Sequence, residues 1–530
     1  MIKPQIVNII NFIRGVEPRD SNLDLLEPVV KQIGILKGHR LPATFLLQHD
    51  ALLQERFTQV LADSLDDTYE IGGWFEVVQS LVEKAGLQWR GRPGFSWDWH
   101  AHVGFSIGYT PEEREKLVDA YMDDFKKVFG RYPQSMGAWI MDAHTLAYMA
   151  DRYGIRAACI CRDQWGTDGY SLWGGYYNQA YYPSKKNVFA PAQTEENTIF
   201  VPVFRMLGSD PIYQYDAGLA DGDTYTPSGH QPVITLEPVY PEAGGSPDWV
   251  RWYFRENFNG KCLSFGYTQA GQENSFGWPM MSRGFTDQME LIAEKAAQGE
   301  LRVETLGSSG KWYRSQYNRT PASAMSAETD WQDRESKSVW FYNRFYRVNF
   351  YMEGDRLWIR DIHRFDESCE ERYLTKTCST ESFVYDNLPV IDGNRWSRGK
   401  TRAGIYPVRL SSDGAKEPLR GADPVVQEAG VDALVITWNL RGGMQLRIHY
   451  KEREIEISCS TPRHEFDWGM EMVWGDEVEV PILSVEEKAV SYKHQGHSYQ
   501  LRAAEGSFLP DQAKKSVLLS PEDGKLVLSI

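Results

Sequence analysis

The chain lacks features that would place it at once in several large classes of protein. It contains no run of about 18 apolar residues, so we expect no transmembrane helix. Only six cysteines are spread over 530 residues, too few for a disulfide scaffold, and we expect them as free thiols. Asp and Glu outnumber Lys and Arg by 73 to 57, and the net charge of −16 argues against a nucleic-acid partner.

The N-terminal residues do not have the pattern of a secretory leader. Residues 2–13 are apolar, but Lys3, Asn8 and Asn11 interrupt them and no small-residue cleavage site follows. We interpret them as a first strand and expect a soluble protein. The compartment stays open, because a leader removed earlier would leave the same sequence. The oligomeric state stays open as well.

Residues 109–165 carry the clearest secondary-structure signals of the chain. Thr110 begins a helix with a proline in its first turn and a Glu three residues after the cap, and Gly130 ends it. An apolar strand at 136–141, a helix that closes at Gly154 and a second apolar strand at 155–161 follow. This alternation is typical of a parallel sheet or barrel.

The same alternation continues over about the first 315 residues and then stops. Within it we expect a further strand at 233–239 and a long loop without regular structure at 88–108. Seven or eight strand–helix steps are enough to close a (β/α) barrel. From about residue 330, short aromatic and alternating strands separated by Gly, Asp and Pro predict an all-β sandwich. We therefore predict an α/β barrel in residues 1–325 and a β-sandwich accessory domain in residues 326–530.

Polar residues follow the predicted barrel strands at the end where such folds carry their chemistry. If the barrel forms, they converge on one mouth, where two carboxylates can perform acid/base or nucleophilic chemistry. Paired carboxylates flanked by aromatic residues are what glycosidic-bond cleavage requires. The candidates are Arg14, Glu17, His49, Asp50, Glu76, Asp142, His144, Arg162, Asp163, Glu237 and Glu273.

Aromatic residues make up 13% of the chain, including 18 tryptophans. Trp97, Trp99 and Trp165 lie beside polar residues in predicted loops, which suits platforms for sugar rings. Packing in the core explains aromatic residues equally well, and both interpretations stay open.

Several segments together resemble the glycoside hydrolase/deacetylase superfamily, which includes polysaccharide-deacetylase-like proteins and family-57-type glycoside hydrolases. The resemblance covers about residues 5–315, and it implies an irregular seven-stranded (β/α) barrel. It rests on the order and spacing of segments 43–45, 70–72, 109–113, 129–133 and 154–155.

The resemblance to family-57-type hydrolases implies roles for particular carboxylates. Their nucleophile ends the fourth strand, which is the position of Asp142, although these enzymes usually carry Glu there. Their acid/base residue lies late in the barrel, where Glu273 is the first candidate and Glu237 and Asp210 follow. Glu76 is a further catalytic candidate.

Each of these carboxylates also has a purely structural interpretation. Asp142 stands between a strand and a helix, where an Asp commonly caps the helix. Glu76 could form an ion pair with a rim arginine such as Arg14 or Arg90. Glu273 could belong to an ordinary polar turn.

The resemblance to deacetylases implies a metal instead. Those enzymes carry an Asp pair after the first strand and an H-x-x-x-H pair after the third, whereas this chain has no Asp at 11–14 and only His100 and His102 in the later segment. Two alternating histidines on a strand would share a face and could share a divalent metal. No other cofactor is expected.

The leading hypothesis is a hydrolase that cleaves glycosidic bonds of an oligo- or polysaccharide, with Asp142 as nucleophile or base and Glu273 as proton donor. The first alternative is a metal-dependent polysaccharide deacetylase that uses His49, His100 or His102 with Asp50. The second is a non-catalytic glycan-binding protein with a degenerate barrel.

Overall fold

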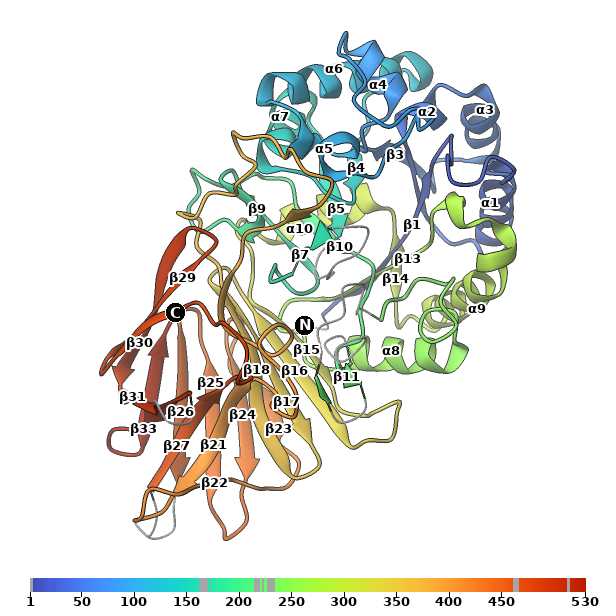
Figure 1. Ribbon diagram of the computed structural model, residues 1–530. Coiled ribbons are helices and arrows are strands. Elements are labelled where there is room, and N and C mark those ends of the chain that lie inside the picture. The colour runs from blue at the N-terminus through green and yellow to red at the C-terminus, as the bar shows by residue number, and fades with distance from the viewer. Residues whose placement is uncertain are drawn as a thin grey trace.

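The N-terminal part of the chain forms a curled, mostly parallel sheet with helices around it, and the C-terminal part forms antiparallel sheets (Figure 1). The structure is a computed structural model that describes residues 3–161, 170–171, 173–213, 220–221, 224–225, 234–460, 467–511 and 515–530. Among them, no helix is long and apolar enough to cross a membrane.

The curled sheet is organised around its first strand, which is buried almost throughout because strands of a parallel sheet are covered on both faces. Antiparallel β7 (Ala180–Tyr181) extends one end of the sheet, and β14 (Arg302–Glu304) pairs with the first strand. In sheet order, the parallel strands are β13 (Gly266–Ala270), β1 (Gln5–Ile13), β2 (Thr44–Leu47), β3 (Glu70–Trp74), β4 (Ser135–Ala138), β5 (Ala157–Cys161) and β10 (Val203–Met206).

Helices follow most of these strands, as the sequence predicts. The helix predicted from Thr110 has both hydrogen bonds of a capping box, and Gly130 ends it in the left-handed conformation at φ 71°. The helices are α1 (Leu26–His39), α2 (His49–Leu52), α3 (Glu55–Ser64), α4 (Gln79–Lys84), α5 (Ala101–Gly104), α6 (Pro111–Phe129), α7 (Ala143–Tyr153), α8 (Pro247–Asn259), α9 (Trp278–Ala297) and α10 (Leu306–Gln316), with 3₁₀ turns η1 (Ser106–Gly108) and η2 (Asn274–Phe276).

In the described residues no backbone ladder joins β13 to β10, the two outermost parallel strands. Side chains fill the space between them. Asn178 donates to the carbonyl of Tyr267 (3.3 Å), and Gln179 donates to that of Phe265 (2.9 Å). The backbone N–H of Arg205 in β10 donates to the carbonyl of Gln179 (3.1 Å). Carbonyls at the β13 edge are thereby satisfied, which keeps this edge from pairing with another strand.

Two large antiparallel sheets form the C-terminal part. The first has the order β15 (Ser323–Ala327), β16 (Ser336–Tyr342), β17 (Tyr346–Glu353), β18 (Arg356–Arg364), β21 (Gly404–Leu410), β27 (Asp467–Val473), β32 (Ser516–Ser520) and β31 (Ser507–Asp511), with β20 (Leu388–Asp392) and β22 (Lys416–Pro418) attached. The second has the order β23 (Val425–Glu428), β24 (Leu434–Asn439), β25 (Gln445–Tyr450), β26 (Glu454–Ser460), β33 (Lys525–Ser529), β30 (His497–Glu505), β29 (Ala489–His494) and β28 (Ile482–Glu486).

Three small ribbons complete the strands. They are β6 (Tyr170–Ser171) with β19 (Phe383–Val384), β8 (Pro183–Ser184) with β9 (Asn187–Pro191), and β11 (Ala220–Asp221) with β12 (Thr224–Tyr225).

The first antiparallel sheet is covered on both of its faces. Phe341 stacks on Tyr450 of the second sheet at 5.5 Å, whereas its neighbour Trp340 stacks on Tyr177 of the N-terminal part at 3.8 Å. Successive residues of a strand face opposite sides, so β16 joins two cores. This explains the nearly continuous aromatic run in this part of the sequence. The division at residue 325/326 stays a prediction, because residues from both segments share one hydrophobic core.

A buried ionic cluster also joins the two parts. Arg347, with no exposed surface, pairs with Asp361 (3.0 Å) and donates to the carbonyl of Gly175 (3.0 Å). His363 lies between Asp361 (3.0 Å) and Asp392 (3.4 Å). Burial opposes both charges, but Arg347 and His363 hold the pKa of Asp361 well below its usual value, and the two carboxylates raise the pKa of His363.

The structure confirms the mixed α/β architecture and the C-terminal antiparallel sheets. The strand count of a closed barrel is not confirmed, since no backbone ladder joins β10 to β13 in the described residues. The expected strand at 233–239 is wrong: residues 234–239 hold only an isolated bridge between Ser209 and Thr235. The segment 88–108, expected as a structureless loop, contains α5 and η1. All six cysteines are free.

We expect Asp361→Asn to destabilise the protein by about 3–5 kcal/mol, because the buried Arg347 loses its counter-ion. Chemical denaturation followed by tryptophan fluorescence would measure the change. Asp432→Asn, at an exposed position, is the matched control. Equal unfolding midpoints for the two variants would contradict the structural role of the cluster.

Candidate active site

The site begins with Arg14, the first residue after β1. Asn274 fixes its backbone on both sides: the N–H of Arg14 donates to Asn274 Oδ1 and Asn274 Nδ2 donates to the Arg14 carbonyl, each at 2.9 Å. The guanidinium lies between two carboxylates, 3.0 Å from Glu76 Oε2 and 3.4 Å from Glu273 Oε2. Arg14 is only 2% exposed, so these contacts take place largely out of water. We call Arg14, Glu76 and Glu273 the Arg14 cluster.

Glu76 follows β3 and has no exposed surface. Gln48, at the end of β2, donates to its Oε2 at 3.0 Å. Burial raises the pKa of Glu76 to about 7 against the opposing charge of Arg14, and the negative charges of Glu273 and Asp50 add to the rise. A carboxyl with this pKa can carry and release a proton near neutral pH.

Glu273 follows β13 and is 5% exposed. The hydroxyl of Ser275 donates to its Oε1, while its Oε2 faces Arg14. Arg14 thus places a positive charge beside Glu273 as well as beside Glu76. The two carboxyl groups therefore share one cation but differ in their remaining contacts.

Asp50 and Glu17 surround the cluster at a greater distance. Asp50 accepts from the backbone N–H of Gly15 (3.0 Å), and burial raises its pKa to about 6. Glu17 holds Arg19 through two contacts of 2.7 and 2.6 Å. Both carboxylates lie near enough to Arg14 to raise its pKa, although burial opposes this.

Aromatic rings form the wall of the site. The Arg14 guanidinium lies 3.8 Å from the ring of Trp97, and Arg19 lies over Trp97 and Trp99 at 5.4 and 5.5 Å. Phe12, two residues before Arg14, stacks on Trp74 at 4.0 Å. Cation–π contacts of this kind keep a buried guanidinium in place without neutralising it.

A segment from the C-terminal part holds this wall in position. Residues 366–387, which we call the strap, run beside the segment that carries Trp97 and Trp99. Cys378 N–H donates to the carbonyl of Ile107, and Ala101 N–H to that of Glu381, each at 2.7 Å. The side chain of Glu371 accepts from the N–H of Ala143 and of Val188, both at 2.8 Å, and from the hydroxyl of Tyr385.

Asp142 does not join the Arg14 cluster through any contact in the described residues. It caps α7, with Oδ1 accepting from Thr145 N–H (2.9 Å) and from Arg114 (3.0 Å). Its Oδ2 accepts from the hydroxyls of Ser106 (2.5 Å) and Thr145 (2.7 Å). Both oxygens are thus engaged, and the structural interpretation of Asp142 as a helix cap is the one observed. These contacts argue against the expected role as nucleophile.

Three other candidates contact side chains outside the cluster. His49, expected at the mouth of the barrel, contacts Ser80 through Nδ1 (2.9 Å) and Asp124 through Nε2 (3.2 Å), between α2, α4 and α6, so both ring nitrogens are engaged. His144 pairs with Glu115 on α6 (3.1 Å), at a half-exposed position between two helices. Glu237 accepts from the hydroxyl of Thr235 (3.0 Å).

Asp210, a reserve candidate for the acid, accepts from the indoles of Trp249 (3.0 Å) and Trp331 (2.7 Å) and is buried. The candidates Arg162, Asp163 and Trp165 lie outside the described residues.

The two histidines proposed for a metal lie side by side, with ring centroids 6.0 Å apart. His102 Nδ1 lies 3.1 Å from the carbonyl of Thr380, and His100 Nδ1 lies 3.4 Å from Asp98. Within the described part of the chain, no three His, Cys, Asp or Glu side chains are placed to hold a metal ion together.

Sequence reasoning missed Gln48, Arg19 and Asn274, which position the charged groups. Gln48 directly precedes His49 and Asp50 at a strand end, so its position in the sequence could have identified it as a site residue. Asn274 follows Glu273, but nothing in the sequence indicates that it bonds to the end of β1, because the partners are 260 residues apart.

Comparison with known proteins supports the fold. No protein-family model and no curated protein matches the chain. A candidate glycoside hydrolase/deacetylase from Parabacteroides distasonis has a similar structure, with a TM-score of 0.53, 15% identity, and coverage of 72% of this chain and 89% of that one. A candidate polysaccharide deacetylase from Mycobacterium smegmatis gives a TM-score of 0.37, with 14% identity and coverage of 60% and 94%. The first likeness confirms the expected resemblance in fold to such a protein, and at this identity it speaks for the fold alone.

We expect Asp142→Asn to lower the free energy of unfolding by about 3–5 kcal/mol, because the fully buried Arg114 loses its carboxylate. Denaturant unfolding would measure this against Asp151→Asn, an exposed change on the same helix. A variant with normal stability and no turnover would instead restore Asp142 as the nucleophile.

Proposed function

We propose that the protein is a carbohydrate-active hydrolase that cleaves glycosidic bonds with Glu76 and Glu273. The observation that carries the proposal is the pair of carboxyl groups on either side of Arg14 at the C-terminal edge of the parallel sheet. Parallel α/β folds hold their reactive groups at this edge. A glycosidase needs one carboxyl that donates a proton and one carboxylate that attacks or activates water.

The two carboxyl groups differ in the way these roles require. Glu76 has a pKa of about 7, so a substantial fraction holds a proton at neutral pH and can protonate the leaving oxygen. Glu273, beside Arg14 and Ser275, is the group that attacks the sugar or activates water. Trp99, which is partly exposed beside Arg19, supplies apolar surface next to the charged groups, whereas Trp97 is buried against Arg14. The substrate would be an oligo- or polysaccharide.

Retention and inversion would be distinguished by the separation of the reacting carboxyl groups in the substrate complex. Retaining enzymes place them about 5–5.5 Å apart and inverting enzymes about 6.5–9.5 Å apart. Arg14 bridges the pair in this structure and would keep Glu273 oriented toward Glu76. The anomer that the enzyme releases first would identify the stereochemical course.

Metal-dependent deacetylation requires a ligand set that the described residues do not assemble. His100 and His102 offer two nitrogens, and His49 is used in contacts with Ser80 and Asp124. Release of acetate from acetylated glycans, together with stoichiometric metal in the purified protein, would favour the deacetylase.

We expect Glu76→Gln and Glu273→Gln each to lower kcat/KM on a cleavable glycan by about 10²–10⁴-fold, the usual contribution of such a group. Reducing-sugar release over a panel of glycans would measure it, with circular dichroism as the check on folding. Glu290→Gln, an exposed change on α9, is the control. Wild-type turnover in either site variant would overturn the assignment, and tight glycan binding without any turnover would favour the non-catalytic alternative.

The pH dependence follows from the pKa of Glu76, which is about 7. A general acid must be protonated, so kcat/KM is expected to be highest below this pH and to fall about tenfold per unit above it. In Glu76→Gln this alkaline limb should disappear from the residual activity. An activity that rises from pH 7 to 9 would contradict the role of Glu76 as the acid.

A further inference from the structure

The first antiparallel sheet carries a groove of about 460 Å³, formed by the β17–β18 hairpin, the start of β21 and the turn before it. We call it the Tyr406 groove. None of its residues belongs to the Arg14 cluster. Its charged and aromatic lining residues are Glu353, Arg356, Trp358, Lys400, Arg402 and Tyr406.

An aromatic ring forms part of the wall of this groove. Tyr406 is partly exposed and stacks on Trp358, with ring centroids 5.3 Å apart and an angle of 21°. Its hydroxyl donates to the carbonyl of Arg402 at 3.0 Å, which fixes the ring plane. An aromatic ring held rigidly beside an open groove offers a flat apolar surface to a sugar ring at little entropic cost.

Trp358, on which Tyr406 stacks, carries a buried donor without a partner among the described residues. Trp358 is 2% exposed and lines the groove, and its indole Nε1 makes no hydrogen bond in the described part of the chain. A buried donor of this kind is costly unless an acceptor reaches it.

The lining of the groove has a positive net charge, although the net charge of the whole protein is strongly negative. Three cations and one carboxylate line it, whereas the net charge of the chain is −16. The two oxygens of Glu353 are used by Arg402 (3.0 Å) and Arg356 (3.1 Å), so this carboxylate orders the arginines. Lys400 is exposed and forms no ion pair with a described residue.

We propose that the Tyr406 groove binds an acidic glycan, with a sugar ring on Tyr406 and its carboxylate beside Lys400 and Arg402. A neutral sugar would use the ring and leave the excess positive charge unmatched, and a simple anion would leave the ring unused. The combination of ring and cations therefore fits a uronate unit. This binding does not depend on the hydrolytic activity of the Arg14 cluster.

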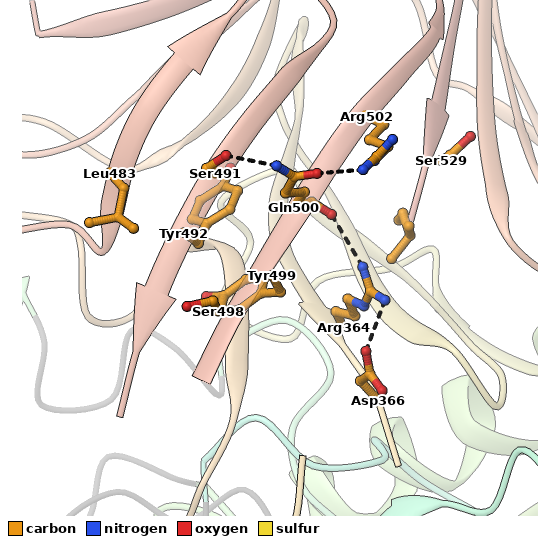
Figure 2. Close-up of a pocket in the computed structure, with 11 residues that line it drawn as sticks. Arg364, Asp366, Leu483, Ser491, Tyr492, Ser498, Tyr499, Gln500, Arg502 and Ser529 are labelled. Carbon is orange, nitrogen blue, oxygen red and sulfur yellow. Dashed lines mark hydrogen bonds and ion pairs between the residues drawn. The ribbon is translucent and has the colours of Figure 1, made fainter. Parts of the chain in front are cut away.

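A larger groove in the second sheet offers an internal comparison. Figure 2 shows this groove of about 610 Å³, in which Arg364 pairs with Asp366 (2.9 Å) and donates to the carbonyl of Gln500 (3.2 Å). Its two tyrosines stack on each other and are at most 6% exposed, so they offer no ring to a sugar. Arg502 in this groove supplies a charge control.

The test is calorimetric titration of the full-length protein with polygalacturonate and with its methyl ester, which has the same backbone without the charge. We expect the acidic polymer to bind more tightly. Tyr406→Ala should weaken its binding about tenfold or more, and Tyr406→Phe should retain it. Lys400→Gln should weaken it roughly threefold and reduce its dependence on salt, whereas Arg502→Gln should leave it unchanged.

Several results would overturn the proposal: no binding of polygalacturonate, equal binding of the methyl ester, or wild-type affinity in Tyr406→Ala. Equal losses of affinity in Lys400→Gln and Arg502→Gln would mean that general surface charge causes the binding. That result would also overturn the proposal. The experiment measures binding, so its outcome does not depend on whether the Arg14 cluster hydrolyses glycosidic bonds.

Discussion

The buried charge of Arg14 is the constraint on which the candidate site depends. A guanidinium this deep in the protein requires carboxylates around it, and the order of the sheet decides which carboxylates can reach it. β13 lies directly beside β1, and β2 and β3 follow on its other side. Glu273, Asp50 and Glu76 therefore meet around Arg14, while Asp142, at the end of β4, is bound by Arg114 on the neighbouring helix.

The C-terminal part takes part in building the site. The strap binds the segment that carries Trp97 and Trp99, and Glu371 anchors it to the start of α7 and to β9. Burial and the nearby charge of Asp142 raise the pKa of Glu371 to about 8. The aromatic wall beside Arg14 thus depends on residues about 270 positions further along the chain.

Local signals in the sequence predicted local structure well. The capping box at Thr110, the glycine end of that helix and the apolar strands of the curled sheet all depend on neighbouring residues, and they appear as expected. The type and approximate position of the site residues were also predictable, because Arg14, Asp50, Glu76 and Glu273 each follow a strand.

The pairing of these residues was not predictable, because it depends on strand order and on contacts across 260 residues. Asp142 illustrates the difference: a cap and a nucleophile occupy the same place in the sequence, and only Arg114, Ser106 and Thr145 around it distinguish them. The wrong strand at 233–239 has a different cause: the segment does meet residues 208–210, but only the isolated bridge between Ser209 and Thr235 forms, which is too short for a ladder.

Direct titration of Glu76 tests the central claim. Infrared difference spectra of the carboxyl band, recorded over pH for the wild-type protein and for Glu76→Gln, would isolate the signal of this one group. The account predicts a carboxyl that titrates near pH 7 in the wild-type protein and is missing from the variant. A Glu76 that titrates near the value of an exposed glutamate, about 4.3, would contradict the buried, Arg14-bridged pair.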